Sequence, residues 1–304
     1  MRYRPFGNSG MAVSAISLGL ADSHTRPKAA DWESLVYAAL ENGVNHFEVM
    51  GRQPALAEGL ARALQAIERR LVCVSWRLGR TLGSAGALVR DFSPGALQRS
   101  VDSILASTGL GYLDVALLDD PHADELHPPT LETLKAMRES GKAKMLGVAG
   151  GDDAIDAHIS TGVFDAACLP FNLVSAWKDR HRLKSAADND MAVTAFDYYP
   201  DRFRTTATAA PKSSHWGQPG AHPLSGAGTY AFLDRTQGWT GEDICLAYAL
   251  TNPSLATVQI IADRPQRIEA MAATVERDLP PGVAAQIEMA RFAPEQPQAA
   301  RKRA

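Results

Sequence analysis

Short apolar runs alternate with amphipathic stretches along nearly the whole chain. Most of the apolar runs are apolar on both faces, as expected for strands that are covered on both sides. Eight such strands are predicted, at residues 15–20, 45–49, 71–77, 113–119, 144–150, 166–171, 192–197 and 257–262.

Several intervening segments have apolar residues at helical spacing and recognisable ends. The clearest are residues 29–43, 93–109, 130–141 and 240–252. Gly43 suits the position just past a helix end, and Ser93 followed by Pro94 suits a helix start. Thr240 has Asp243 three residues on, which is close to a capping box.

This alternation predicts an α/β fold, a (β/α)₈ TIM barrel. A doubly wound sheet is the rival interpretation. However, no GxGxxG motif opens a first helix, and the "GLG" at 109–111 precedes a strand. Residues 1–14 predict a short N-terminal β-hairpin, with "GNSG" at its turn, that closes the barrel floor.

The chain is expected to form a single domain over residues 1–292. Residues 198–238, rich in Pro, Gly, Ser and Thr, predict a long loop over the C-terminal face of the barrel, and a loop of this length is usually functional or mobile. The polar tail 293–304 is expected to be disordered.

Composition narrows the class of protein. The 304 residues are 45% hydrophobic and 21% charged, and a net charge of -3 gives no general attraction to nucleic acid or anionic membrane. The chain has no apolar run long enough to span a bilayer and no secretory signal at its start, so a cytoplasmic protein is expected. Cys73, Cys168 and Cys245 lie in apolar runs and are expected to be small buried residues. The eight histidines are scattered, so no metal site is predicted.

Five segments, in order and at the right spacing, carry a family resemblance. They are "MRYRPFGNSGMAVSAISLGL", "ALENGVNHFE", "GYLDVALLDDP", "LETLKAMRESGKAKMLGVAG" and "FDAACLPFNLV". In these segments the chain resembles the aldo-keto reductases along nearly its whole length. The resemblance implies the barrel of that family, a nicotinamide cofactor across its mouth, and an Asp, Tyr, Lys and His tetrad in which the tyrosine protonates a carbonyl oxygen.

The tetrad itself is not retained. The aspartate position falls on Glu48 in an ungapped alignment, and a shifted alignment instead places Met50 at the tyrosine position. The lysine position falls on Arg77 and the histidine position on Asp119. Arginine stays protonated at any biological pH, and an aspartate replaces a neutral donor with an acceptor.

Two interpretations of these residues stay open. Arg77, Glu48 and Asp119 could form an internal ion-pair cluster, or they could contact a ligand or carry out non-redox chemistry. A reductase would need another acid, and Asp120, His122 and Tyr198 are the candidates.

The resemblance also implies where a cofactor would contact the chain. The aromatic platform for the nicotinamide ring falls on Phe196, next to Asp197, with Arg77 at the same mouth. The serine and asparagine that grip the carboxamide fall on Ala149 and Gly150, and their glutamine partner on Cys168.

At the adenosine end, the position of an arginine that would pair with the 2′-phosphate of NADP falls on Asp263. A carboxylate repels that phosphate and accepts a hydrogen bond from a ribose hydroxyl. Arg264 and Arg267 lie nearby, and their positive charges would instead attract a 2′-phosphate. The prediction is therefore NAD(H), with NADP(H) less favoured.

Two functions follow. The first is a regulator on a reductase scaffold that binds a dinucleotide and acts through protein partners. The chain is similar to an oxidoreductase-like cell-division regulator of stalked alpha-proteobacteria, which implies contacts with the division protein FtsZ and the histidine kinase DivJ. The alternative is an enzyme, either an NAD(P)H-dependent oxidoreductase with a substitute acid or a non-redox catalyst.

Overall fold

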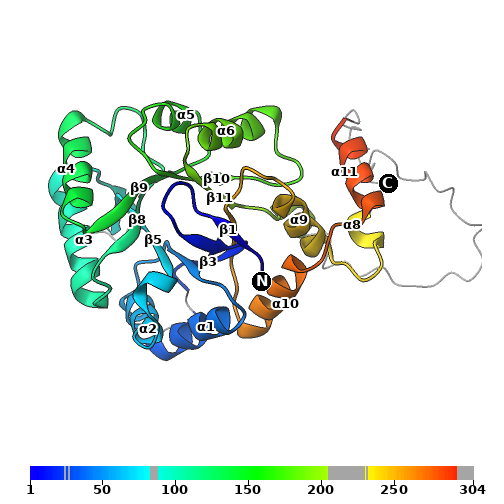
Figure 1. Ribbon diagram of the computed structural model, residues 1–304, viewed down its shortest axis with the longest axis horizontal. Coiled ribbons are helices and arrows are strands. Elements are labelled where there is room, and N and C mark those ends of the chain that lie inside the picture. The colour runs from blue at the N-terminus through cyan, green and yellow to red at the C-terminus, as the bar shows by residue number, and fades with distance from the viewer. Residues whose placement is uncertain (24, 27, 83–87, 205–229, 231, 293–304) are drawn as a thin grey trace, which may run out of the picture.

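The computed structural model describes residues 1–292 except 24, 27, 83–87, 205–229 and 231. Eight parallel strands close into a barrel (Figure 1). Each strand pairs with the next one in chain order, and the last of them pairs with the first. The strands are β3 (Ile16–Leu20), β4 (His46–Val49), β5 (Cys73–Leu78), β8 (Leu113–Asp119), β9 (Ala143–Ala149), β10 (Ala166–Pro170), β11 (Ala192–Phe196) and β12 (Thr257–Ile260).

Helices surround the barrel and cover the outer face of its strands (Figure 1). The ring consists of α1 (Ala29–Glu41), α2 (Pro54–Leu64), α3 (Pro94–Thr108), α4 (Pro128–Glu139), α5 (Ala154–Ile159), α6 (Trp177–Asp188), α9 (Gly241–Leu250) and α10 (Pro265–Val275). Helix α11 (Pro281–Phe292) follows the ring and lies to one side of it in Figure 1. The predicted (β/α)₈ barrel is confirmed.

Alternation along the strands separates two apolar clusters. Outward-facing side chains such as Phe47, Val74 and Leu118 join the large cluster under the helices. Inward-facing residues form a smaller cluster inside the barrel, which includes Phe6 and Val13 from the N-terminal hairpin. That hairpin pairs β1 (Tyr3–Pro5) with β2 (Ala12–Ser14) and closes the barrel floor, as predicted.

Helix ends follow the sequence signals closely. The Thr240 hydroxyl accepts a hydrogen bond from the Asp243 amide at 3.1 Å, and the Asp243 carboxylate accepts one from the Thr240 amide at 2.9 Å, which completes a capping box. Ser93 precedes Pro94 at the start of α3, but its side chain makes no capping bond.

Leu71 was expected to begin a strand, and this is wrong. It lies exposed in a short 3₁₀ helix (Arg69–Leu71) before β5.

The barrel carries an extra hairpin that the apolar pattern does not predict. Its strands, β6 (Arg80–Leu82) and β7 (Leu88–Arg90), pair antiparallel directly after β5. In the segment 198–238, the described parts form two short helices, α7 (Asp201–Arg204) and α8 (Phe232–Arg235). Most of that segment and the tail 293–304 lie outside the described residues, so the limits of the single domain stay a prediction.

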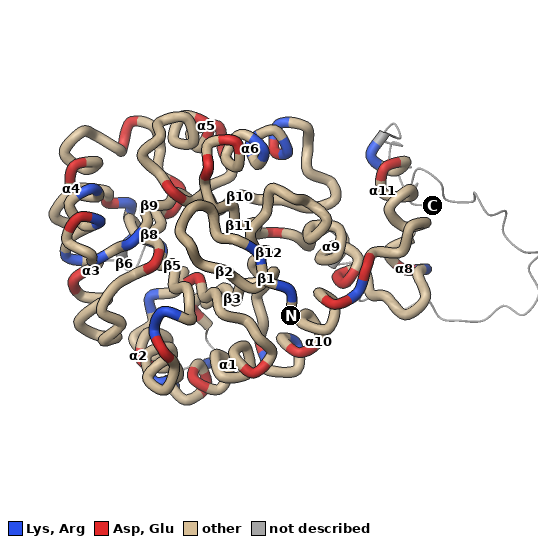
Figure 2. Tube along the Cα trace, viewed as in Figure 1, with Lys and Arg blue, Asp and Glu red and all other residues tan. Residues whose placement is uncertain are grey.

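Charged residues of both signs are interspersed around the outer helices (Figure 2). In the described part of the chain, no helix is both long enough and apolar enough to cross a membrane. Cys73, Cys168 and Cys245 are buried free thiols, which confirms their expected burial.

Candidate functional site

The C-terminal ends of β4, β5 and β8 bring three charged side chains together. The Arg77 Nε donates to Glu48 Oε1 at 2.7 Å, and Arg77 Nη1 donates to Asp119 Oδ1 at 3.0 Å. Glu48 is only 1% exposed, and the side chains of Arg77 and Asp119 are 13% and 14% exposed. The internal ion-pair cluster considered from the sequence is therefore present.

Cys168 on β10 completes this cluster from the opposite side of the barrel. Its thiol lies 3.4 Å from Glu48 Oε2 and 3.6 Å from Arg77 Nη2. Burial, together with the negative charge of Glu48, raises the pKa of Cys168 well above its usual range. The thiol is therefore neutral and donates to the carboxylate.

The protonation state of Arg77 follows from its surroundings. Burial lowers the pKa of Arg77, but the carboxylates of Glu48 and Asp119 outweigh burial and raise it above its ordinary value. The guanidinium stays charged and cannot release a proton to a substrate.

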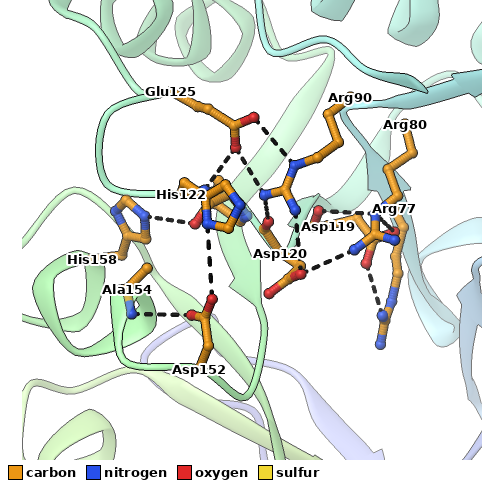
Figure 3. Close-up of polar contacts among 11 residues, drawn as sticks. Arg77, Arg80, Arg90, Asp119, Asp120, His122, Glu125, Asp152, Ala154 and His158 are labelled. Carbon is orange, nitrogen blue, oxygen red and sulfur yellow. Dashed lines mark hydrogen bonds and ion pairs between the residues drawn. The ribbon is translucent and has the colours of Figure 1, made fainter. Parts of the chain in front are cut away.

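The network continues outward through two arginines of the extra hairpin (Figure 3). Arg80 on β6 contacts Asp119 Oδ2 at 2.9 Å and Asp120 Oδ2 at 3.1 Å. Arg90 on β7 contacts Asp120 at 3.5 Å and Glu125 Oε2 at 2.8 Å. Each carboxylate of this network, namely Glu48, Asp119, Asp120 and Glu125, thus has an arginine partner, and the network ties the hairpin to the loop after β8.

Sequence reasoning missed Arg80, Arg90 and Glu125. Their pairing depends on the β6–β7 hairpin folding back over the barrel mouth, and no short sequence motif predicts that hairpin. The left-handed backbone at Asp120, with φ of 56°, is equally invisible in the sequence, although aspartate is one of the residues that tolerate it.

The candidate substitute acids lie in different settings. Asp120 is held by Arg80 and Arg90. Tyr198 points to another cluster, where its hydroxyl donates to Glu242 Oε1 at 2.6 Å. The side chain of His122 is 53% exposed, and its Nδ1 lies 3.9 Å from Asp152 Oδ2 (Figure 3). Of these three residues, His122 alone combines exposure with a titratable group near the barrel mouth.

The residues at the expected nicotinamide position offer little to a carboxamide. Ala149 is fully buried and has no polar side-chain atom, and the Gly150 amide already donates to the Cys168 carbonyl at 3.1 Å. The Cys168 thiol is engaged by Glu48. The Phe196 ring has the Arg77 guanidinium 5.6 Å from its centroid, so one face of the platform is occupied. The residues at this position therefore do not supply the hydrogen bonds to the carboxamide that the family resemblance implies.

The residues at the expected adenosine position are more open. Asp263 and Arg264 are exposed and contact each other at 3.4 Å. Arg267 is held by Glu242 at 2.5 Å and also donates to the Ile261 carbonyl at 3.2 Å. The charge of Arg267 is therefore compensated by a partly buried partner, whereas Asp263 and Arg264 form an exposed pair, and the Asp263 carboxylate faces solvent. Asp197, which follows Phe196 in a left-handed conformation with φ of 55°, is exposed.

These two groups of residues lie apart. Glu48, Arg77, Asp119, Ala149, Cys168 and Phe196 meet at the ends of barrel strands, while Asp263, Arg264 and Arg267 lie where α10 begins. Met50 follows β4, and its amide donates to the Leu20 carbonyl at 2.8 Å. Among the described residues, no group of three or more His, Cys, Asp or Glu side chains is arranged to hold a metal ion.

The arrangement at the mouth can hold charge but is poorly suited to moving a proton. Both inner carboxylates are acceptors bound by Arg77, and the neighbouring thiol is neutral. A general acid must lie within hydrogen-bond reach of the reacting oxygen and have a pKa near the working pH. Arg77 keeps its proton, and the carboxylates of Glu48 and Asp119 accept its hydrogen bonds, so the cluster directs no free proton donor toward a substrate.

Comparisons with known proteins agree with the fold. An L-galactose dehydrogenase of Arabidopsis thaliana is 28% identical over 162 residues, which is 49% of this chain and 49% of that protein, so the chain spans about half the length of this curated relative. The holo form of an aldo-keto reductase from Bacillus halodurans superposes with a TM-score of 0.76 at 16% identity, over 97% of this chain and 99% of the other. A glycerol dehydrogenase of Gluconobacter oxydans gives a TM-score of 0.71 at 15% identity, over 99% of each chain.

The structural likenesses show the fold alone at these identities. The family is established by the sequence model of the aldo/keto reductase family, which matches residues 15–291. Together with the barrel and the floor hairpin, this match shows that the chain belongs to the aldo/keto reductase family.

Proposed function

We propose that this protein is a catalytically degenerate aldo/keto reductase that binds a nicotinamide dinucleotide and acts as a regulator through protein partners. The observation that supports this most directly is the Glu48–Arg77–Asp119 cluster at the barrel mouth. It occupies the positions at which the family resemblance expects the aspartate, lysine and histidine of the tetrad.

Loss of turnover follows from the chemistry of the cluster. A carbonyl oxygen that receives a hydride must also receive a proton. Arg77 cannot supply it, and the carboxylates beside it would repel the developing negative charge. The poor fit at Ala149 and Gly150 removes the grip on the carboxamide as well. Proton delivery to the carbonyl oxygen and placement of the nicotinamide for hydride transfer are thus both disfavoured.

Binding at the adenosine end is the part of the cofactor interaction that this chain supports. The family generally binds a nicotinamide dinucleotide. We propose NAD(H) in preference to NADP(H), because the exposed Asp263 carboxylate would repel a 2′-phosphate and would accept from a ribose hydroxyl. The pairing of Arg267 with Glu242 removes one of the cations that could have favoured NADP(H).

The partners proposed for this role are those of KidO, the cell-division regulator that the sequence resembles, namely FtsZ and the histidine kinase DivJ. A dinucleotide can control such contacts only if it binds one surface conformation better than another. A purified-protein binding assay with FtsZ or with the DivJ kinase, in the presence and absence of NADH, tests this part of the proposal. Affinity that is absent, or present but insensitive to NADH, counts against it.

The cofactor proposal is tested by titrating the protein with NADH or NADPH while following tryptophan fluorescence. Asp263→Arg should shift the preference toward NADPH, whereas Glu269→Arg, a charge reversal on the exposed face of α10, should leave the preference unchanged. A panel of aldehydes and ketones is then added, and absorbance of the reduced nicotinamide is followed. Saturable binding without cofactor oxidation is the expected result, and steady oxidation by any carbonyl would refute the regulatory assignment.

A second candidate is an NAD(P)H-dependent oxidoreductase in which His122 replaces the tyrosine as acid. The exposure of His122 near the mouth favours it, and two of the three proteins compared above are named as dehydrogenases. In this case the same carbonyl assay gives turnover, and His122→Gln abolishes it. A non-redox reaction using Glu48 and Asp119 is less well supported, because one arginine binds both carboxylates.

A further inference from the structure

A cleft of about 840 Å³ opens between α2 and α3, beside β5. These two helices are neighbours in the outer ring (Figure 1). The lining comes from the β4–α2 connection, α2, the end of β5, the start of the extra hairpin, and α3. Of the positions at which the family resemblance expects the cofactor, Arg77 lines the cleft, whereas those on β9, β10, β11 and α10 do not. The cleft therefore begins at the barrel mouth and extends between α2 and α3, away from most of the expected dinucleotide site.

Small side chains explain why the two helices leave this space open. On α3, Ala96, Ser100, Ser103 and Ser107 recur every three or four residues and so share one face of the helix. Ala57 lines the cleft from α2. Such short side chains cannot fill the gap between helices whose backbones are held apart by the barrel.

The floor of the cleft is apolar. Trp76 and Leu78 are buried residues of β5 and line it together with Ile104 of α3. A ligand pocket typically has a mostly apolar lining with a few polar groups that fix orientation, and a volume of roughly 300–1,000 Å³. The cleft between α2 and α3 has both properties.

The charge of the lining is positive. Four arginines contribute, and two of them, Arg77 and Arg80, are paired with the carboxylates of the mouth network. Among the described residues, no carboxylate lies within ion-pair distance of either Arg52 or Arg99. Arg52 uses its Nε to donate to the Arg80 carbonyl at 2.8 Å, and no described residue accepts a hydrogen bond from its terminal nitrogens.

The acidic residues of the lining do not cancel these two cations. Glu58 is bound by Arg62 of the same helix. Asp91 accepts from the Ser93 amide at 3.0 Å, and this bonding with Ser93, together with the charge of Arg99, lowers its pKa. Asp91 therefore offsets part of the charge of Arg99 from a distance, but no described carboxylate forms an ion pair with either of the two cations, and both guanidinium groups border an apolar space.

From these features we propose that the α2–α3 cleft binds a small organic anion, a phosphate ester or carboxylate with an apolar body. Its anionic group is held by Arg52 and Arg99, with the hydroxyls of Ser100 and Ser103 as further donors. Charge-assisted hydrogen bonds from arginine to phosphate or carboxylate are among the strongest available to such a site. The apolar body rests on Trp76. This ligand is separate from the dinucleotide of the proposed function.

The fluorescent probe 8-anilinonaphthalene-1-sulfonate tests the site, because it combines an anionic group with an aromatic body. Saturable binding to the native full-length protein is expected. Arg52→Gln and Arg99→Gln should each weaken it about tenfold or more, because each removes a charge-assisted hydrogen bond. Arg70→Gln, which changes an exposed arginine outside the cleft, is the matched control and should leave binding unchanged. Near-UV circular dichroism confirms that each variant is folded.

Competition identifies the chemistry of the ligand. Displacement by phenyl phosphate but not by octanoate indicates a phosphate ester, and the reverse indicates a carboxylate. Binding that persists in saturating NADH shows that the cleft is independent of the dinucleotide site, so failure of one proposal does not decide the other. Displacement by neither competitor, or equal affinity in both cleft variants and the control, overturns the proposal.

Discussion

Replacing Arg77 by methionine tests the central electrostatic claim most directly. Methionine has a similar length but no charge, so Arg77→Met removes both ion pairs and leaves Glu48, which is 1% exposed, without a cation. At 2.7 Å and 3.0 Å, the gross attraction of each pair is about 6 kcal/mol at an effective dielectric constant of 20. Most of this offsets the cost of burying the charges. Breaking such a buried pair from one side costs about 3–5 kcal/mol.

The cause of that loss can be separated from simple repacking. If an uncompensated Glu48 is responsible, Glu48→Gln should rescue Arg77→Met, so that the double variant is about 1–3 kcal/mol more stable than Arg77→Met alone. Glu48→Gln by itself should cost about 1–3 kcal/mol, because a charged hydrogen bond to Arg77 becomes a neutral one.

Equilibrium unfolding in urea, followed by circular dichroism, gives these free energies. Arg70→Met serves as the control, because Arg70 pairs with Glu68 on the surface and should change stability by no more than about 0.5 kcal/mol. A double variant that is no more stable than Arg77→Met would show that Glu48 carries no buried negative charge. The account of the barrel mouth would then be wrong.

Three further predictions concern the scaffold. Burial lowers the pKa of His46 to about 4, below the value of about 6.5 expected in the unfolded chain, so the unfolded chain binds the proton more tightly. Stability should therefore be complete above about pH 6.5 and fall by about 3 kcal/mol toward pH 4. Urea unfolding at several pH values should show a smaller decline for His46→Gln. His181→Gln, which changes an exposed histidine of α6, is the control and should keep the full decline. An equal decline in the two variants would contradict the prediction. In the same assay, Thr240→Ala should lower the free energy of unfolding by about 1 kcal/mol, because it removes the cap of α9. Ser93→Ala should lower it by only about a few tenths of a kcal/mol, because the Ser93 side chain makes no capping bond. Equal losses would argue against the capping box. Phe6→Ala should cost about 3–5 kcal/mol and lower Tm, because it empties the barrel floor, and an unchanged Tm would show that the hairpin does not support the barrel.

The barrel could be predicted from local patterns because each element carries its own signal. Fully apolar runs indicate strands covered on both faces, and Thr240 with Asp243 marks a helix start through bonds within a single turn. Such signals depend on residues three or four positions apart, so they act before any tertiary contact forms. Leu71 shows their limit, since an apolar residue next to a strand was exposed in a 3₁₀ turn.

The sequence also indicated which residues occupy the reductase positions, and it left their interaction open. Glu48 and Arg77 are 29 residues apart, and Arg77 and Asp119 are 42 apart. Only closure of the barrel places their strands side by side with these side chains facing inward. Whether the three charges pair or contact a ligand is decided by that geometry.

The extra hairpin and the α2–α3 cleft were decided by tertiary structure alone. Arg80 and Arg90 join the mouth network because β6 and β7 fold back beside the loop after β8. The cleft exists because short side chains on separate helices meet across a gap that the barrel spacing imposes. The chain by itself determined which segments become strands and helices, because that information is local. The partners of each charge and the shape of each cavity depend on distances between segments far apart in the sequence, which only the packed fold sets.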